Sequence, residues 1–254
     1  MIPLHPGFLT QPLAHRGFHD VVKGRPENSR AAILAALDAG YGIEIDVQLS
    51  ADDQAMVFHD YALDRLTSST GMVRAQTKPD LKTVPLTGGD ETIPDLAEIL
   101  DLVNGQVPLV IEIKDQSGDM GPDVGPLEEA TAAVVHGYKG PLALMSFNPH
   151  SVACLARIAP DIPRGLVTSD FIASEWPELT QARCDELRHI PDFDRVGASF
   201  VSHQANQLDN PRLGEIKASG GKIWCWTIKS EAQERQARNV AENITFEGYA
   251  ATLP

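Results

Sequence analysis

The sequence GIEIDVQL at residues Gly42–Leu49 alternates like a strand buried in a sheet, yet it carries two carboxylates. Successive side chains of a strand point to opposite faces, so Glu44 and Asp46 share one face. Their neighbours in the chain are aliphatic, and a carboxylate in such surroundings is costly unless it is paired with a cation or binds a metal. The stretch therefore predicts a strand that also contributes to a functional site.

Short apolar runs of this kind alternate with amphipathic stretches along the whole chain. We expect strands at Pro12–Ala14, Gly42–Leu49, Leu109–Lys114, Leu142–Ser146, Arg164–Thr168, Val196–Val201, Lys222–Ile228 and Ile244–Phe246. We expect helices at Ser29–Ala39, Pro94–Leu102, Gly125–Gly137, Pro149–Ile158, Glu178–Leu187, Asn210–Ala218 and Glu231–Ala241. Alternating strands and helices indicate a parallel sheet with right-handed crossovers. Eight strands in 254 residues favour a closed (β/α)8 TIM barrel of the α/β class over an open doubly wound sheet.

One segment interrupts this alternation. Residues Leu63–Glu91 are rich in Thr, Ser and Gly and include two prolines, which predicts a small insertion after the second strand, packed over one end of the barrel. The length alone also fits two small domains, but the strand pattern continues through the chain. We therefore expect a single barrel domain over residues 1–254.

The composition limits the partners. Lys and Arg number 21 against 35 Asp and Glu, which gives a formal net charge of −14. Nucleic acids and anionic membranes call for basic surfaces, so we expect neither as a partner. An anionic small-molecule substrate would need a local cation, such as a metal with Arg or Lys beside it. Three cysteines without a CxxC motif, and an N-terminus without signal-peptide features, predict a reduced, cytoplasmic protein without stable membrane insertion.

Charged motifs lie at three of the expected strands. They are His15-Arg16-Gly17 with Pro26-Glu27-Asn28-Ser29, then Glu44-Ile45-Asp46 with His59-Asp60, and then Glu112-Ile113-Lys114. The C-terminal ends of barrel strands converge on one face, so we expect these motifs to form one active site.

The residue types in these motifs indicate a particular chemistry. Carboxylates suit hard cations, and Glu44, Asp46 and Glu112 would supply three of them for Mg²⁺ or Ca²⁺. A cation there would polarise a phosphoryl group, while two histidines exchange protons with the nucleophile and the leaving group. Arg16 and Lys114 would add positive charge for a phosphate.

Each motif is weak when taken alone. Glu112 and Lys114 also fit an ion pair at the barrel rim, and an isolated histidine is more often structural or exposed than catalytic. The order and spacing of the motifs therefore carry the prediction. The remaining histidines are expected to be structural or exposed: His5, His19, His136, His150, His189 and His203.

In this order the motifs resemble the glycerophosphodiester phosphodiesterase family, in the superfamily of phosphatidylinositol-phospholipase-C-like phosphodiesterases. The resemblance is close over the first half of the chain. It implies one divalent metal, Mg²⁺ or Ca²⁺, held by Glu44, Asp46 and Glu112, with His15 and His59 as the acid–base pair. The implied reaction is hydrolysis of glycerophosphodiesters to glycerol 3-phosphate and an alcohol.

The resemblance implies further binding residues. Arg16 and Lys114 would be phosphate ligands, with Glu27 either orienting Arg16 or lying near the metal. Trp226 falls where the family has a Trp-Thr pair, so we expect it to line the glycerol pocket, whereas Trp224 fits barrel packing at least as well.

The C-terminus departs from the family pattern. Thr245-Phe246-Glu247-Gly248-Tyr249 stands where many relatives have a Gly-Asp-Gly strand and an Asp-x-Pro ending. The contribution of the last strand to the site, and with it the substrate head group, stays open.

Two other functions compete with hydrolysis. A barrel that binds glycerophosphodiesters without turnover would not need paired proton carriers, and a lyase or phospholipase acting on lipid would want an apolar or basic membrane face. The sequence does not distinguish attack by a neighbouring glycerol hydroxyl, which gives a cyclic phosphate, from attack by water. It also leaves open the acid and base roles of the two histidines, Mg²⁺ versus Ca²⁺, and the oligomeric state.

Overall fold

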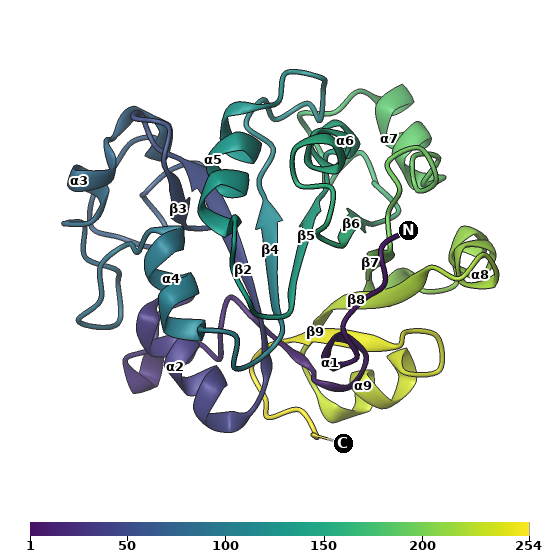
Figure 1. Cartoon of the computed structure of the whole chain (residues 1–254), viewed down its shortest axis with the longest axis horizontal. Helices are drawn as coiled ribbons and strands as arrows, with labels where there is room; N and C mark the ends of the chain where they lie inside the picture. The colour runs from purple at the N-terminus through teal and green to yellow at the C-terminus, as the bar shows by residue number, and fades with distance from the viewer. Residues whose placement is uncertain (254) are drawn as a thin grey trace.

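The computed structural model describes residues 1–253, and its parallel strands close into a barrel surrounded by helices (Figure 1). The strands of the described chain form one sheet in the order β1-β9-β8-β7-β6-β5-β4-β2-β3, and β1 also pairs with β2, which closes the ring. The barrel strands are β1 (Leu13–His15), β2 (Gly42–Leu49), β4 (Leu109–Ile113), β5 (Leu142–Ser146), β6 (Arg164–Thr168), β7 (Phe200–Gln204), β8 (Lys222–Ile228) and β9 (Asn243–Phe246). The expected (β/α)8 barrel is confirmed.

Helices follow the barrel strands and cover the outside of the barrel. They are α2 (Arg30–Ala39), α4 (Leu96–Val103), α5 (Pro126–Val135), α6 (Pro149–Ile158), α7 (Gln181–Arg188), α8 (Pro211–Ala218) and α9 (Glu231–Ala237). The helix ends have clear causes: the Ser29 hydroxyl accepts a hydrogen bond from the Ala32 amide, and Gly40 ends α2 in the left-handed conformation. None of the helices within residues 1–253 combines the length and the apolar character needed to cross a bilayer.

Aromatic side chains fill the barrel interior toward its N-terminal end. The ring of Trp224 stacks on Phe200 with centroids 3.8 Å apart, and on Phe8 of the short helix α1 (Gly7–Thr10) at 5.5 Å. Gly165 faces the Phe200 ring so closely that any larger side chain would collide with it. The interior is therefore packed at this end, and the inward side chains nearer the C-terminal ends of the strands are those left to line a cavity.

The segment between β2 and α4 packs around a small apolar core of its own. It contains β3 (Ala55–Val57), which pairs antiparallel with β2, the short helix α3 (Lys78–Leu81) and the 3-10 helix η2 (Val73–Ala75). Figure 1 shows it to one side of the barrel, beside α4 and α5. The expected insertion lies here, and it brings its own polar side chains to the rim next to β2. Its apolar core consists of Met56, Phe58, Leu63, Val73, Leu81, Leu86 and Ile93.

Two strands differ from the sequence prediction. The strand expected at Val196–Val201 begins only at Phe200, because Gly197 has a φ of 61° and the Val196 amide donates to the Asp192 carbonyl in a turn. Val196 is buried in that turn, so an apolar run did not distinguish a strand from a packed loop. Strand β3 was not predicted at all, since three residues are too short to show a period. The 3-10 helices η1 (Val21–Lys23) and η3 (Ala205–Gln207) were also not predicted.

Candidate active site

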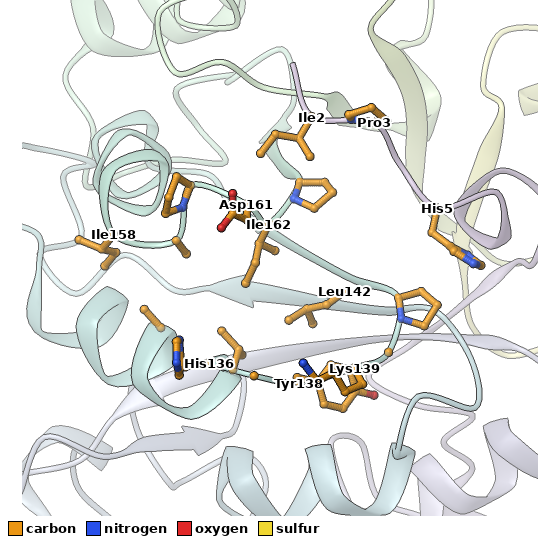
Figure 2. A pocket seen from close by; sticks show the side chains of 18 residues that line it. Ile2, Pro3, His5, His136, Tyr138, Lys139, Leu142, Ile158, Asp161 and Ile162 are labelled. Atoms are coloured by element: carbon orange, nitrogen blue, oxygen red, sulfur yellow. The ribbon is translucent and has the colours of Figure 1, made fainter.

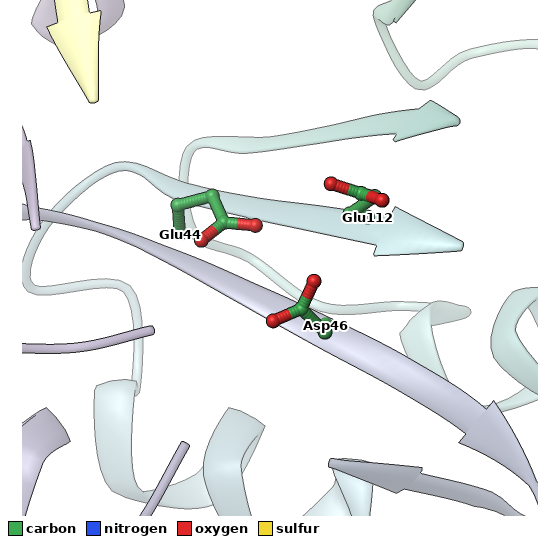
Figure 3. Close-up of side chains that lie close together, drawn as sticks. All are labelled: Glu44, Asp46 and Glu112. Carbon is green, nitrogen blue, oxygen red and sulfur yellow. The ribbon is translucent and has the colours of Figure 1, made fainter. Parts of the chain in front are cut away.

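Three carboxylates meet where β2 and β4 run side by side. Asp46 pairs in register with Glu112, and Glu44 lies two residues earlier on the same face of β2. One oxygen from each of the three side chains lies within 4.8 Å of the others (Figure 3). The exposed fraction is 1% for Glu44 and Asp46 and 7% for Glu112. The strand pairing alone therefore places three buried carboxylates within the span of one cation.

The electrostatics of this cluster favour a bound cation. Burial, followed by repulsion from Asp46 and Glu112, raises the pKa of Glu44 well above its usual value. One oxygen of Glu44, Oε1, is buried without a hydrogen-bond partner. A buried oxygen without a donor is unfavourable, and a hard cation would satisfy it. The donor set of three oxygens thus fits Mg²⁺ or Ca²⁺ better than a softer metal.

Lys114 follows β4 and partly neutralises the cluster. Its Nζ atom lies 2.8 Å from Asp46 Oδ1 and 2.7 Å from Glu112 Oε1. Burial alone would lower the pKa of Lys114, but attraction by Asp46 and then Glu112 outweighs burial and raises it. Burial would likewise raise the pKa of Asp46, but Lys114, His59 and Arg16 together outweigh it and hold that pKa far below the usual value. Lys114 therefore stays charged beside Asp46.

His15 ends β1, on the Glu44 side of the cluster. Its Nε2 lies 3.9 Å from Glu44 Oε2, and its Nδ1 lies 2.6 Å from Oε2 of Glu247. Burial is the main cause that lowers the pKa of His15 to about 4. The hydrogen bond with His15 is the main cause that lowers the pKa of Glu247. A neutral imidazole beside an ionised carboxylate is the arrangement that presents Nε2 as a proton acceptor.

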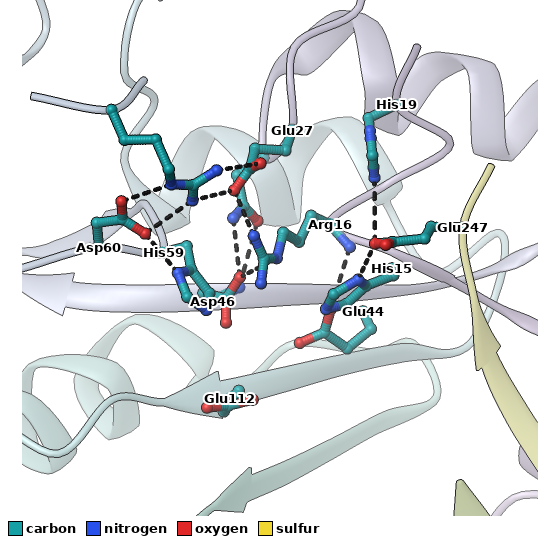
Figure 4. Close-up of polar contacts among 12 residues, drawn as sticks. His15, Arg16, His19, Glu27, Glu44, Asp46, His59, Asp60, Glu112 and Glu247 are labelled. Atoms are coloured by element: carbon teal, nitrogen blue, oxygen red, sulfur yellow. Dashed lines mark hydrogen bonds and ion pairs between the residues drawn. The ribbon is translucent and has the colours of Figure 1, made fainter. Parts of the chain in front are cut away.

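His59 lies on the Asp46 side of the same cluster, after β3 (Figure 4). Its Nδ1 is 2.6 Å from Oδ1 of Asp60, and its backbone carbonyl accepts a hydrogen bond from the Gln48 amide at 2.9 Å. Arg65, from the insertion, donates to both oxygens of Asp60 at 2.7 Å. The two imidazoles therefore lie on either side of the carboxylates, and each has a carboxylate at its Nδ1 atom.

Arg16 reaches the site through the turn after β1. Its backbone amide donates to Glu44 Oε2 at 3.1 Å, its Nη1 donates to Glu27 at 2.6 Å, and its Nε lies 3.4 Å from Asp46 Oδ2. Asn28 holds Asp46 from the same loop, since its side-chain amide donates to Oδ2 at 2.9 Å. Glu27 therefore orients Arg16, which was one of the two positions expected for it.

These side chains open onto one cavity of about 360 Å³ at the C-terminal end of the barrel. One wall is apolar, where Trp226 packs edge-on against Phe147 with centroids 5.5 Å apart and donates from its indole to the Ser202 carbonyl at 3.0 Å. Trp224 instead lies fully buried in the barrel core. The remaining lining is mostly charged or polar, and it includes His15, Arg16, His19, Glu27, Glu44, His59, Arg65, Glu112, Lys114, Lys229 and Glu247.

A larger hollow of about 750 Å³ lies at the opposite side, at the N-terminal ends of β5 and β6 (Figure 2). His5, His136 and Lys139 border it, and Asp161 is the carboxylate among its lining residues. One carboxylate does not make a site for a hard cation. The chemistry therefore lies in the smaller cavity.

The structure brings all nine of the predicted site residues together. Eight of them line the cavity, and Asp46 lies behind Lys114 and Arg16. Sequence reasoning missed Arg65, Glu247 and His19, which border the same cavity. Position after the last strand was the one signal available for Glu247, because a residue just beyond a barrel strand lies at the catalytic rim.

Fold and site together define a class, a (β/α)8 barrel whose C-terminal rim combines buried carboxylates, imidazoles and cations. Comparison with known proteins specifies it further: the glycerophosphoryl diester phosphodiesterase family model matches residues 15–243. The chain belongs to this family, so the expected family and enzyme class, a phosphoric diester hydrolase, are confirmed.

Individual relatives agree with this assignment. The chain is 30% identical to a glycerophosphodiester phosphodiesterase of Caldanaerobacter subterraneus over 244 residues, covering 91% of each protein. It is 33% identical to a glycerophosphodiester phosphodiesterase of Bacillus altitudinis, over 65% of this chain and 69% of the relative. Among solved structures, an Oleispira antarctica phosphodiesterase in complex with the product sn-glycerol-3-phosphate superposes with a TM-score of 0.78 at 26% identity, covering 96% of this chain and 94% of that one.

Proposed function

We propose that this enzyme hydrolyses glycerophosphodiesters to glycerol 3-phosphate and an alcohol with one divalent cation, Mg²⁺ or Ca²⁺, and two histidines as proton carriers. The observation that carries the proposal is the position of the imidazoles. His15 and His59 lie on either side of the carboxylate cluster, and each has Nδ1 hydrogen-bonded to a carboxylate at 2.6 Å. A binding barrel without turnover would not need two oriented proton carriers.

Glu44, Asp46 and Glu112 would hold the cation. When bound, it would polarise the phosphoryl group and offset the negative charge that grows in the transition state. With all three carboxylates ionised and Lys114 and Arg16 protonated, the cluster carries a net charge of −1 and would repel an anion. A divalent ion reverses that sign, so an acidic protein can still bind a phosphodiester.

The remaining residues would bind and orient the substrate. Arg16 is held by Glu27 and keeps donors for a phosphate oxygen, and Lys114 supplies a second charge from the end of β4. Trp226 and Phe147 form an apolar wall that suits the carbon side of a glycerol unit. One histidine would take the proton of the attacking oxygen while the other protonates the departing alkoxide.

The attacking oxygen is either a neighbouring glycerol hydroxyl or water. Attack by the hydroxyl is favoured by its high effective molarity and gives a cyclic phosphate that water then opens. Brief reaction in ¹⁸O-labelled water, with trapping of a cyclic phosphate, separates the two routes.

The proposal is tested by incubating the protein with a panel of glycerophosphodiesters and measuring released glycerol 3-phosphate, with and without divalent metal. Chelation should abolish release, and Mg²⁺ or Ca²⁺ should restore it. The variants His15→Asn and His59→Asn should each lower turnover by about 10²- to 10⁴-fold while remaining folded. His136→Asn is the matched control, since His136 borders the hollow at the opposite side.

Turnover that is unchanged by the chelator would contradict the role of the metal. Near-normal turnover in both histidine variants would contradict the acid–base pair. Calorimetric binding without product release would favour the non-catalytic barrel.

A further inference from the structure

Glu247 reaches His15 because of how the barrel closes. The first strand pairs with the last, and the register aligns Ala14 of β1 with Phe246 of β9. The next residues along the chain are His15, the last residue of β1, and Glu247, which directly follows β9. They therefore emerge at the same point of the C-terminal rim. Their side chains meet there, with Nδ1 of the imidazole 2.6 Å from Oε2 of the carboxylate.

The carboxylate of Glu247 is itself fixed from several sides. Its Oε1 atom lies 2.8 Å from Nζ of Lys229, and its Oε2 atom lies 3.6 Å from Nε2 of His19. Its backbone amide donates to the Ile228 carbonyl at 2.9 Å, which ties the residue to the end of β8. The exposed fraction of the Glu247 side chain is 20%. The carboxylate is therefore oriented by basic neighbours toward His15.

The second imidazole has the same arrangement from different elements. Asp60 lies 2.6 Å from Nδ1 of His59, and Arg65 binds both oxygens of Asp60, as Lys229 binds Glu247. In both cases the imidazole contacts a carboxylate, and that carboxylate in turn contacts a basic side chain. Such a repeated order, built once from β1, β8 and β9 and once from the insertion, indicates a shared role in orienting the rings.

We propose that Glu247 is the positioning residue of His15: it accepts the Nδ1–H hydrogen bond, fixes that tautomer, and leaves Nε2 facing the carboxylate cluster. The inference rests on the proposed function and adds a residue to it. As the attacking oxygen forms its bond to phosphorus, the bond to the leaving alkoxide breaks, the proton of the attacking oxygen passes to Nε2 of His15, and His59 protonates the alkoxide. The resulting imidazolium of His15 lies beside the Glu247 carboxylate. Without that carboxylate, the ring is free to rotate or to carry its proton on the wrong nitrogen.

The test measures the tautomer and the kinetics separately. In the wild-type protein, ¹⁵N NMR of the His15 ring should show a protonated Nδ1 and an unprotonated Nε2. The variant Glu247→Gln should lower kcat by about 10- to 100-fold with little change in KM, because the defect lies in orientation and not in binding. Glu247→Asp, which keeps the charge, should recover part of the loss. Glu215→Gln, which removes one surface charge from α8, is the matched control and should have no effect.

Several outcomes would overturn the inference. A wild-type ring with its proton on Nε2 contradicts it directly, and this reading needs no variant to fold. Wild-type kcat in Glu247→Gln contradicts it while leaving the proposed function intact, provided that His15→Asn is inactive. A wild-type protein without any hydrolysis defeats the proposed function instead, and the NMR tautomer still shows whether Glu247 fixes the ring.

Discussion

His203 is a buried titratable side chain that has no role in the proposed chemistry. It lies fully buried in β7, with its Nδ1 atom 2.7 Å from the hydroxyl of Thr168, and its Nε2 atom has no hydrogen-bond partner. Burial lowers the pKa of His203 from 6.5 to about 4. Between these two values the unfolded chain binds a proton that the folded protein does not. The folded state therefore loses stability as the pH falls through this window, and the full stability is present above it.

The variant His203→Asn should remove this part of the acid sensitivity. Asn keeps a polar atom near the position of Nδ1, so the bond with Thr168 survives, but the side chain does not titrate. Urea unfolding at pH 7 and pH 4.5 should show that the wild-type protein loses about 2–3 kcal/mol more than the variant on acidification. His5→Asn, at an exposed position, is the control and should behave like the wild type. Equal losses in His203→Asn and the wild type would contradict the shift.

The residues of the site could be predicted to different degrees. Glu44 and Asp46 were visible because two carboxylates in an aliphatic strand have no structural explanation. Glu247 was invisible as a partner of His15, because the contact depends on the pairing of the first strand with the last. Arg65 looked like any polar residue of an insertion. Local pattern shows which side chains are unusual, whereas their partners depend on closure of the barrel.

At the scale of elements, the sequence predicted those helices and strands whose apolar residues recur with a regular period. The helices and most barrel strands lie within a few residues of their expected places, since amphipathic and aliphatic runs are long enough to read. The insertion has no such period. Its three-residue strand β3 forms because β2 offers an edge, and its small apolar core forms only once Met56, Leu63 and Leu81 are brought together.

Arg65 connects this insertion to both halves of the site. Its guanidinium donates to both oxygens of Glu27 at 2.9 Å and to both oxygens of Asp60 at 2.7 Å. Glu27 orients Arg16, and Asp60 orients His59. One side chain of the insertion thus fixes the positions of a phosphate ligand and a proton carrier.

Replacing Arg65 with Met should therefore impair catalysis more than folding. We expect kcat/KM to fall by up to about 10²-fold, because displacement of a reacting group by about 1 Å costs that much. The measurement is steady-state kinetics together with thermal unfolding. Arg74→Met is the control within the same insertion, since Arg74 binds Asp53 and the Ser50 carbonyl away from the cavity. A variant Arg65→Met with unchanged kinetics would show that the loops hold their positions without this contact.

At the scale of the whole molecule, the net charge of −14 sets the terms for binding an anion. The carboxylates of the site lie on the neighbouring barrel strands β2 and β4, so their mutual repulsion is a cost to folding when no cation is present. A cation that binds the folded protein and not the unfolded chain stabilises the fold by mass action. Metal binding can therefore be detected without any substrate.

Thermal unfolding with added Mg²⁺ or Ca²⁺ tests whether a bound cation stabilises the folded protein by offsetting the repulsion among the carboxylates. At a metal concentration about 100-fold above Kd, the folded state should gain about 2.7 kcal/mol. For a chain of this size, that gain corresponds to a rise in Tm of roughly 5–10 °C. NaCl at the same ionic strength should give a smaller shift, since screening relieves buried repulsion poorly.

The variant Asp46→Asn locates the effect. It removes one of the three carboxylates and weakens the contact with Lys114, so its Tm without metal is not the relevant quantity. The metal-induced rise in Tm should disappear in Asp46→Asn and persist in Asp52→Asn, because Asp52 lies in the exposed turn after β2. An equal rise in both variants would place the cation elsewhere on the acidic surface. No rise in the wild type would contradict the proposed cation site at Glu44, Asp46 and Glu112.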